Sequence, residues 1–199
     1  MTADSGDAGF WDQRYQQHST PWDTAGLPGS FADEAGRLLQ AGSRRVLVPG
    51  CGSAYEVAAL AQQGCQVLAV DFSAPAVARA RELHPELAHL IQQADFFSAA
   101  TDGPWDWVYE RAFLCALPPR MREAYAARMA AILPAGAVLA GYFYLGDKRG
   151  GPPYTIAPAA LQALLGRYFV LERQLKPLGS LPVFGDGEHW MVWRRSQEA

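Results

Sequence analysis

Residues 45–71 constrain the fold more than any other part of the sequence. Residues 45–49 (RVLVP) are a short apolar run that is typical of a buried strand. A glycine-containing turn follows, and residues 55–63 form an Ala-rich helical segment. Residues 66–70 (QVLAV) are a second buried strand. Because two strands joined by a crossover helix lie parallel in a sheet, this stretch predicts an α/β fold.

The rest of the chain continues the alternation of helices and strands. Further helices are predicted at Ser30–Gln40, Ser73–Leu83, Pro119–Leu133 and Ala159–Arg167. Further strands are predicted at Leu90–Ala94, Trp105–Tyr109, Ala137–Tyr144, Tyr168–Arg173 and His189–Arg194. No helix separates the last two, so we expect them to pair antiparallel. The pattern predicts a doubly wound, mostly parallel seven-stranded Rossmann-like sheet with an antiparallel edge strand.

Several side chains refine these expectations. Ser30 and Asp33 fit a capping box, and Ser73 fits the N-cap of the helix that follows it. We interpret Arg128, together with its neighbours Arg120 and Arg122, as the exposed face of its helix. No linker divides the chain, so we expect one domain over residues 1–199, with residues 1–29 preceding the first core helix.

The composition excludes several classes of protein. Seventeen basic and twenty acidic side chains give a net charge of −3, which does not favour nucleic acid or a membrane surface. No apolar run is long enough to span a bilayer, and the three cysteines show no metal-binding spacing. We therefore expect a cytoplasmic monomer with free thiols, no metal and a small-molecule partner.

The glycine turn predicts a cofactor site. Gly50 and Gly52 lie between a strand and a helix, where the backbone can approach a ligand closely. Asp71 ends the next strand, where a carboxylate can bind both ribose hydroxyls. A dinucleotide fingerprint requires a third glycine where this chain has Tyr55, so NAD is the weaker alternative. A nucleoside cofactor without phosphates, such as S-adenosylmethionine, fits the turn better.

Asp95 and Phe96 follow the third predicted strand. The Asp95 carboxylate is placed to accept from an exocyclic amine, and Phe96 is placed to pack on an adenine ring. The alternative is a loop acid beside core phenylalanines. Combined with the glycine turn and Asp71, the pair points to S-adenosylmethionine.

Five blocks, in the same order, resemble the thiopurine, thiol and halide methyltransferase family. The blocks are Phe10-Trp11-Asp12-x-x-Tyr15 with Pro21-Trp22, the VLVPGCG turn, Asp95-Phe96-Phe97, YERAFLCALP at residues 109–118, and GGPPY at residues 150–154. The resemblance runs from Phe10 to about Trp193. It implies a methyltransferase sheet and S-adenosylmethionine as the cofactor.

The resemblance also implies roles for individual residues. Trp11, Tyr15 and Trp22 would belong to a lid over the cofactor, formed by residues 1–29. The remaining implied cofactor-binding residues are Gly50, Gly52, Asp71, Asp95, Phe96 and Arg111. Arg111 and Tyr154 are also candidates for contacting the methyl acceptor, on motif position alone. No general base is identified.

Two departures from the family pattern bear on the branch. Ala54 replaces a glycine of the turn, and the turn reads Pro-Gly-Cys-Gly where thiopurine members have Pro-Leu-Cys-Gly. With Pro21-Trp22, this places the chain nearer the thiol and halide branch. The expected activity is methyl transfer to a thiol, hydrosulfide, thiocyanate or halide. The alternatives are a thiopurine acceptor, an NAD-dependent oxidoreductase, and an inactive cofactor-binding domain.

Overall fold

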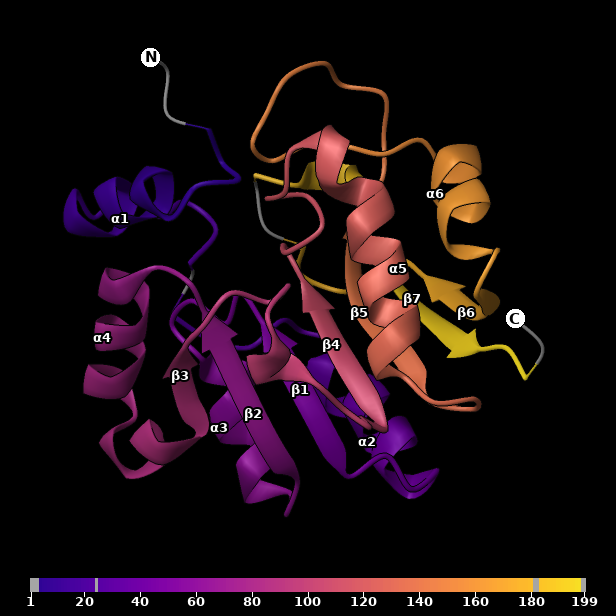
Figure 1. Ribbon diagram of the computed structural model, residues 1–199, viewed down its shortest axis with the longest axis horizontal. Helices are drawn as coiled ribbons and strands as arrows, with labels where there is room; N and C mark the ends of the chain where they lie inside the picture. The colour runs from indigo at the N-terminus through magenta and orange to yellow at the C-terminus, as the bar shows by residue number, and fades with distance from the viewer. Residues whose placement is uncertain (1–3, 24, 181–182, 198–199) are drawn as a thin grey trace.

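The computed structural model describes residues 4–23, 25–180 and 183–197. Seven strands form one sheet with helices packed around it (Figure 1). The strands are β1 (Arg45–Pro49), β2 (Gln66–Asp71), β3 (Ile91–Gln93), β4 (Trp107–Arg111), β5 (Val138–Tyr144), β6 (Phe169–Leu175) and β7 (Glu188–Arg195). The helices are α1 (Ala8–Gln16), α2 (Phe31–Gln40), α3 (Tyr55–Gln62), α4 (Ala74–Leu83), α5 (Arg122–Ile132) and α6 (Pro158–Leu165). Within these residues, no helix has the length and apolar character needed to cross a bilayer.

The sheet has the strand order β3-β2-β1-β4-β5-β7-β6. Strands β1 to β5 are parallel to one another, whereas β7 runs antiparallel to both β5 and β6. The predicted doubly wound, mostly parallel sheet with an antiparallel edge is confirmed, and the reversed strand is the one next to the edge. The order reverses between β1 and β4, so a crevice is expected beyond their carboxyl ends.

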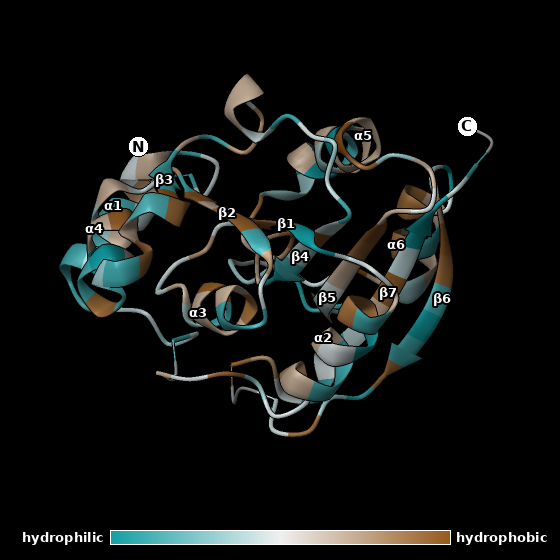
Figure 2. Cartoon of the chain, turned by 90° about the horizontal axis from the view of Figure 1, so that it is seen from below, coloured by the Kyte–Doolittle hydropathy of each residue, from teal (hydrophilic) through white to brown (hydrophobic). Residues whose placement is uncertain are grey.

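The two faces of the sheet bury different helices. On β1, Val46 and Val48 pack in the cluster that holds the apolar residues of α2, α3 and α4. Leu47 points the other way, into the cluster formed by α5 and α6. Figure 2 shows α2 and α3 on one side of the sheet and α5 on the other. This alternation explains why the parallel strands are continuously apolar: both faces are covered.

The predicted helix starts have different outcomes. The Ser73 hydroxyl accepts from Ala76 N at 3.4 Å, which confirms the N-cap of α4. The capping box at Ser30 is wrong, because Ser30 has helical backbone angles and its hydroxyl accepts from Leu178 N at 2.8 Å. The prediction that Arg128 lies on the exposed face of its helix is also wrong. Its side chain is only 17% exposed and donates to Ser98 O in a neighbouring loop.

Strand β4 lies two residues later than the sequence predicts. The Asp106 carboxylate accepts from the backbone N–H groups of Arg44 and Arg45, at 3.0 and 2.8 Å. Asp106 therefore anchors the start of β1. The shift places Glu110 and Arg111 at the carboxyl end of β4, where Arg111 reaches the crevice.

Candidate functional site

A cavity lies beyond the carboxyl ends of β1, β2 and β4. Its wall comes from residues within segments 5–26, 48–56, 70–72, 94–97, 109–121, 152–153 and 183–184. All nine predicted cofactor residues line it: Trp11, Tyr15, Trp22, Gly50, Gly52, Asp71, Asp95, Phe96 and Arg111. The fold thus gathers residues that lie up to 100 positions apart in the sequence.

The glycine turn needs its glycines for both conformation and space. Gly50 and Gly52 have φ values of +59° and +50°. A Cβ at Gly50 would lie 2.7 Å from Phe113 Cδ2, and one at Gly52 would lie 2.8 Å from Tyr15 Oη. Ala54 also has a positive φ, +59°, which costs an L-residue about 1 kcal/mol. The alanine fits at this position, but in a strained conformation.

Asp71 is buried at the end of β2, on the cavity wall. Its Oδ1 accepts from Ser73 N at 3.0 Å, and its Oδ2 accepts from Gly52 N at 3.1 Å. Burial, aided by the negative charge of Asp12, raises the pKa of Asp71 to about 6. Each carboxylate oxygen has a second lone pair, so Asp71 can still accept from a ligand hydroxyl.

Asp95 and Phe96 differ in burial although they are adjacent. Asp95 is exposed, and its Oδ1 accepts from Phe97 N at 2.9 Å. Phe96 is 4% exposed and packs edge-to-face against Phe97 and Phe113. Phe96 therefore belongs to the core and to the cavity wall at once.

Arg111 is a nearly buried cation on the cavity wall, with its side chain 13% exposed. Its Nε lies 3.3 Å from Glu56 Oε1, and its guanidinium stands over the Tyr142 ring at 5.2 Å from the centroid. Its Nη1 is buried, and no described residue provides a hydrogen-bond acceptor for it. A buried donor without a partner is costly, which suits a ligand that supplies an acceptor.

The other candidates are placed less favourably for chemistry. Tyr154 is not among the described residues that line the cavity, whereas Pro152 and Pro153 are. Cys51 and Cys115 line the cavity, but burial raises the pKa of both thiols. A raised pKa disfavours the thiolate, so neither cysteine is an activated nucleophile.

The N-terminal segment covers one side of the cavity. Helix α1 places Trp11 and Tyr15 on one face, and both rings pack edge-to-face against Trp22, with centroids 5.5 and 6.2 Å apart. Trp11 Nε1 donates to Ser5 O at 2.8 Å. Figure 1 shows α1 above α4, next to the carboxyl ends of the strands.

Several cavity residues escaped sequence reasoning. The Ser53 hydroxyl donates to Asp23 Oδ2 and so ties the glycine turn to the N-terminal segment. Glu56 pairs with Arg111. Phe113 occupies the space that a side chain at Gly50 would need. The only sequence signal that Glu56 lies at the site is its place in the first turn of the helix after the glycine turn, and this signal is weak. The sequence offers no signal for the Ser53–Asp23 bond.

A family model described as thiopurine S-methyltransferase matches residues 6–180. The chain belongs to this family. The match includes all the residues that line the cavity except Ser5, Val183 and Phe184. The expected enzyme class, an S-adenosylmethionine-dependent methyltransferase, is thereby confirmed, and an NAD-dependent oxidoreductase is set aside.

Known relatives come from both branches of the family. A probable thiol methyltransferase 2 of Arabidopsis thaliana is 30% identical over 166 residues, covering 79% of this chain and 72% of the relative. A thiopurine S-methyltransferase of Azotobacter vinelandii is 34% identical over 176 residues, covering 79% and 81%. The similar identities do not assign the chain to a branch.

Solved structures confirm the fold. The 1,6-didemethyltoxoflavin-N1-methyltransferase of Burkholderia thailandensis, solved with bound S-adenosylhomocysteine, has a TM-score of 0.74 and 18% identity, covering 95% of this chain and 87% of that chain. The Rossmann-like methyltransferase sheet expected from the sequence is therefore observed.

Proposed function

We propose that this protein transfers a methyl group from S-adenosylmethionine to a small soft nucleophile: a thiol, hydrosulfide, thiocyanate or a halide. The observation that carries this proposal is Arg111, a nearly buried cation on the cavity wall whose Nη1 has no partner among the described residues. Such a site suits a small anion beside a cationic cofactor. The thiol and thiocyanate methyltransferases of Arabidopsis thaliana among the relatives support the choice.

The cavity residues fit S-adenosylmethionine. The turn at Gly50 and Gly52 leaves no room for a Cβ and lines the cavity, where its backbone can meet the methionine portion. Asp71 offers lone pairs for the ribose hydroxyls. Asp95 and Phe96 are assigned to the adenine, on the neighbouring wall. The acidic side chains around the cavity also favour a ligand that carries a positive charge.

We assign residues 1–29 as a lid of a single domain that spans residues 1–199; residues 1–3 and 24 lie outside the described part. Trp11, Tyr15 and Trp22 line the cavity, and the first two pack edge-to-face against Trp22. Burial and the nearby Asp71 charge raise the pKa of Tyr15, so its hydroxyl stays neutral. Aromatic rings exclude water and attract a cation, which are the two properties that a lid over a sulfonium needs.

S-adenosylmethionine, when bound, supplies a methyl group on a positively charged sulfur. The protein has to align the acceptor with that methyl group and keep water away from both. Iodide, thiocyanate and hydrosulfide arrive ionised, so for these acceptors the chain need not supply a general base. A thiol would react as its thiolate, having released its proton to solvent before the transfer. Arg111 would attract the anion, and Pro152 and Pro153 would shape the acceptor side of the cavity.

Arg111 provides the test of the acceptor site. Replacing Arg111 alone leaves Glu56 as a buried, unpaired carboxylate, so the informative variant is Arg111→Met with Glu56→Gln. We expect it to lower kcat/KM for iodide and thiocyanate by about tenfold or more, since a buried charged contact is lost. Glu56→Gln alone is the control for the altered pair. Unchanged acceptor kinetics in the double variant would refute this role.

The second candidate is a thiopurine acceptor, which the relatives named thiopurine S-methyltransferase favour. Turnover of a thiopurine with no turnover of the small anions would select it. We also propose that the protein works as a monomer. Analytical ultracentrifugation of the active protein tests that assignment.

A further inference from the structure

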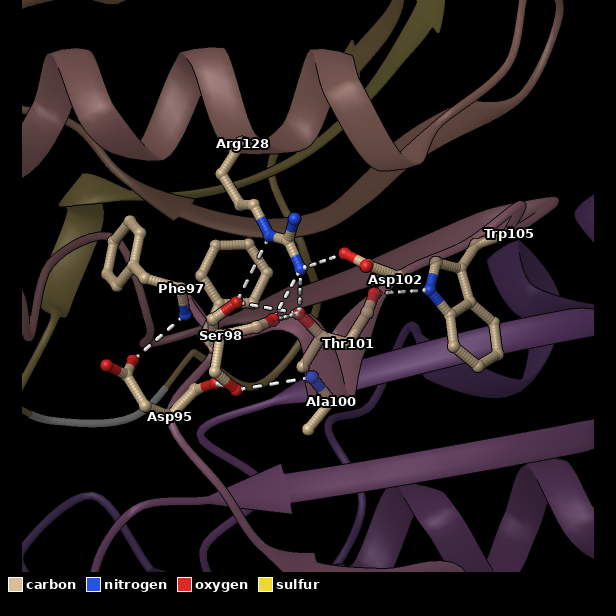
Figure 3. A network of polar contacts seen from close by, with 9 residues as sticks. Asp95, Phe97, Ser98, Ala100, Thr101, Asp102, Trp105 and Arg128 are labelled. Carbon is tan, nitrogen blue, oxygen red and sulfur yellow. Dashed lines mark hydrogen bonds and ion pairs between the residues drawn. The ribbon is translucent and has the colours of Figure 1, made fainter.

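Arg128, on α5, connects that helix to the loop that carries Asp95 and Phe96. Its Nε donates to Phe96 O at 3.3 Å, and its Nη2 donates to Ser98 O at 2.6 Å. The same Nη2 lies 2.7 Å from Thr101 Oγ1 and 2.9 Å from Asp102 Oδ1. Figure 3 shows the guanidinium reaching from the helix into the curve of the loop. One side chain therefore holds four groups of a loop about 30 positions earlier in the sequence.

Thr101 completes the clamp from within the loop. It is fully buried, and its hydroxyl donates to Phe96 O at 2.7 Å while accepting from Arg128. Trp105 Nε1 donates a hydrogen bond to Thr101 O at 2.9 Å. Phe96 O is thus held by two donors, one from the loop and one from α5.

The clamped carbonyl belongs to the residue next to Asp95. One Asp95 oxygen, Oδ1, is held by Phe97 N, and no described residue donates to the other, Oδ2. Arg128 does not line the cavity itself, whereas Asp95 and Phe96 do. A displacement of the Phe96 peptide would therefore move the free Asp95 oxygen relative to the cavity.

We propose that Arg128 and Thr101 are positioning residues that set the protein's specificity for the base of its cofactor. They do so by fixing where Asp95 meets the exocyclic amine of adenine. This inference rests on the cofactor-binding part of the proposed function, because it takes Asp95 to bind the adenine. It concerns recognition of the base, which lies away from the transferred methyl group.

The test compares the binding of two ligands. S-inosylhomocysteine differs from S-adenosylhomocysteine in having a carbonyl oxygen where adenine has its exocyclic amine. The Kd of each is measured by calorimetry for the wild type, Arg128→Ala, Thr101→Val and Asp95→Asn. We expect the wild type to prefer S-adenosylhomocysteine by about tenfold or more, because the carbonyl oxygen cannot donate to Asp95. All three variants should lose most of that preference.

Two controls separate positioning from a general loss of stability. Thr101→Ser keeps the hydroxyl and should retain the preference. Arg195 also donates to two backbone carbonyls, of Ala130 and Tyr168, but it lies at the other end of the sheet, where its N–H bonds Ala137 O. Arg195→Ala should lower the unfolding midpoint and leave the ratio of the two Kd values unchanged.

The outcomes are distinct. A wild-type preference that survives in both Arg128→Ala and Thr101→Val overturns the positioning role, and so does a wild type without preference. If Arg128→Ala does not fold, Thr101→Val and its serine control decide. A wild type that prefers S-adenosylhomocysteine but turns over no acceptor would refute the proposed function and leave this inference standing.

Discussion

Asp71 combines two demands that oppose each other. As a structural residue it accepts from the N–H groups of Gly52 and Ser73, which requires burial beside the glycine turn. In its proposed role at the cofactor ribose it has to be ionised to accept strongly from two hydroxyls. Burial is the larger influence and raises its pKa to about 6. In the free protein Asp71 therefore titrates at a higher pH than an ordinary aspartate.

This pKa predicts how cofactor affinity depends on pH. The Kd of S-adenosylhomocysteine should rise as the pH falls below about 6, because protonation removes the charge that the ribose hydroxyls bind. Asp71→Asn should weaken binding by about tenfold or more and flatten this pH dependence. Calorimetric titrations across this pH range measure both effects. An equally pH-dependent Kd in Asp71→Asn would assign the titration to another group.

The sequence predicted residues that line the cavity, but it misplaced Arg128, which supports the cavity wall from behind, for a physical reason. Gly50, Gly52 and Asp71 are predictable from local sequence patterns. A strand, a glycine turn and the end of the next strand place the turn's backbone and the carboxylate together at the carboxyl ends of parallel strands. Arg128 was misread as exposed, because its partners lie about 30 positions away and only the tertiary fold brings them together. Helical spacing alone does not show which polar side chain of α5 turns inward.

The loop between β4 and α5 depends on a single buried carboxylate. Glu110 Oε1 accepts from Phe113 N and Leu114 N at 2.8 and 3.0 Å, and Oε2 accepts from Tyr125 Oη at 2.6 Å. These bonds place Phe113 against Gly50, so the loop and the glycine turn are built around each other. Burial raises the pKa of Glu110 to about 7.

A raised pKa in the folded state makes stability depend on pH. The stabilisation from protonated Glu110 is present below its unfolded-state pKa of 4.5 and is lost as the pH rises through about 7. The difference amounts to about 3 kcal/mol over that range. Glu110→Gln should therefore lose less free energy of unfolding than the wild type between about pH 5 and about pH 8. Urea unfolding at both pH values measures this, and parallel losses in the two proteins would contradict it.

Strand boundaries show where element-scale prediction stops. The apolar run around Trp105–Tyr109 indicated a strand, but Asp106 is used to anchor β1, so β4 begins at Trp107. The correct boundary depends on a bond between segments about 60 positions apart. Similarly, Ser30 was predicted to cap α2, and a distant backbone group, Leu178 N, uses its hydroxyl instead.

At the scale of the whole molecule, the cavity follows from sheet topology. The strand order reverses between β1 and β4; the glycine turn follows β1 directly, and Arg111 is the last residue of β4. The alternation of elements predicted this parallel sheet and its antiparallel end. It did not predict that β7 inserts between β5 and β6, because two strands without a crossover can pair at either edge. The insertion also brings Phe184, which precedes β7, to the cavity.

The central claim is tested most directly by a single-turnover experiment. Enzyme in excess is mixed with S-adenosylmethionine carrying a labelled methyl group, together with iodide or thiocyanate, and the labelled methyl product and S-adenosylhomocysteine are quantified together. We predict that both products appear in equal amounts, and faster than without enzyme or with Asp71→Asn at the same cofactor concentration. Labelled cofactor that binds tightly but stays intact with every small anion and thiol would contradict the account.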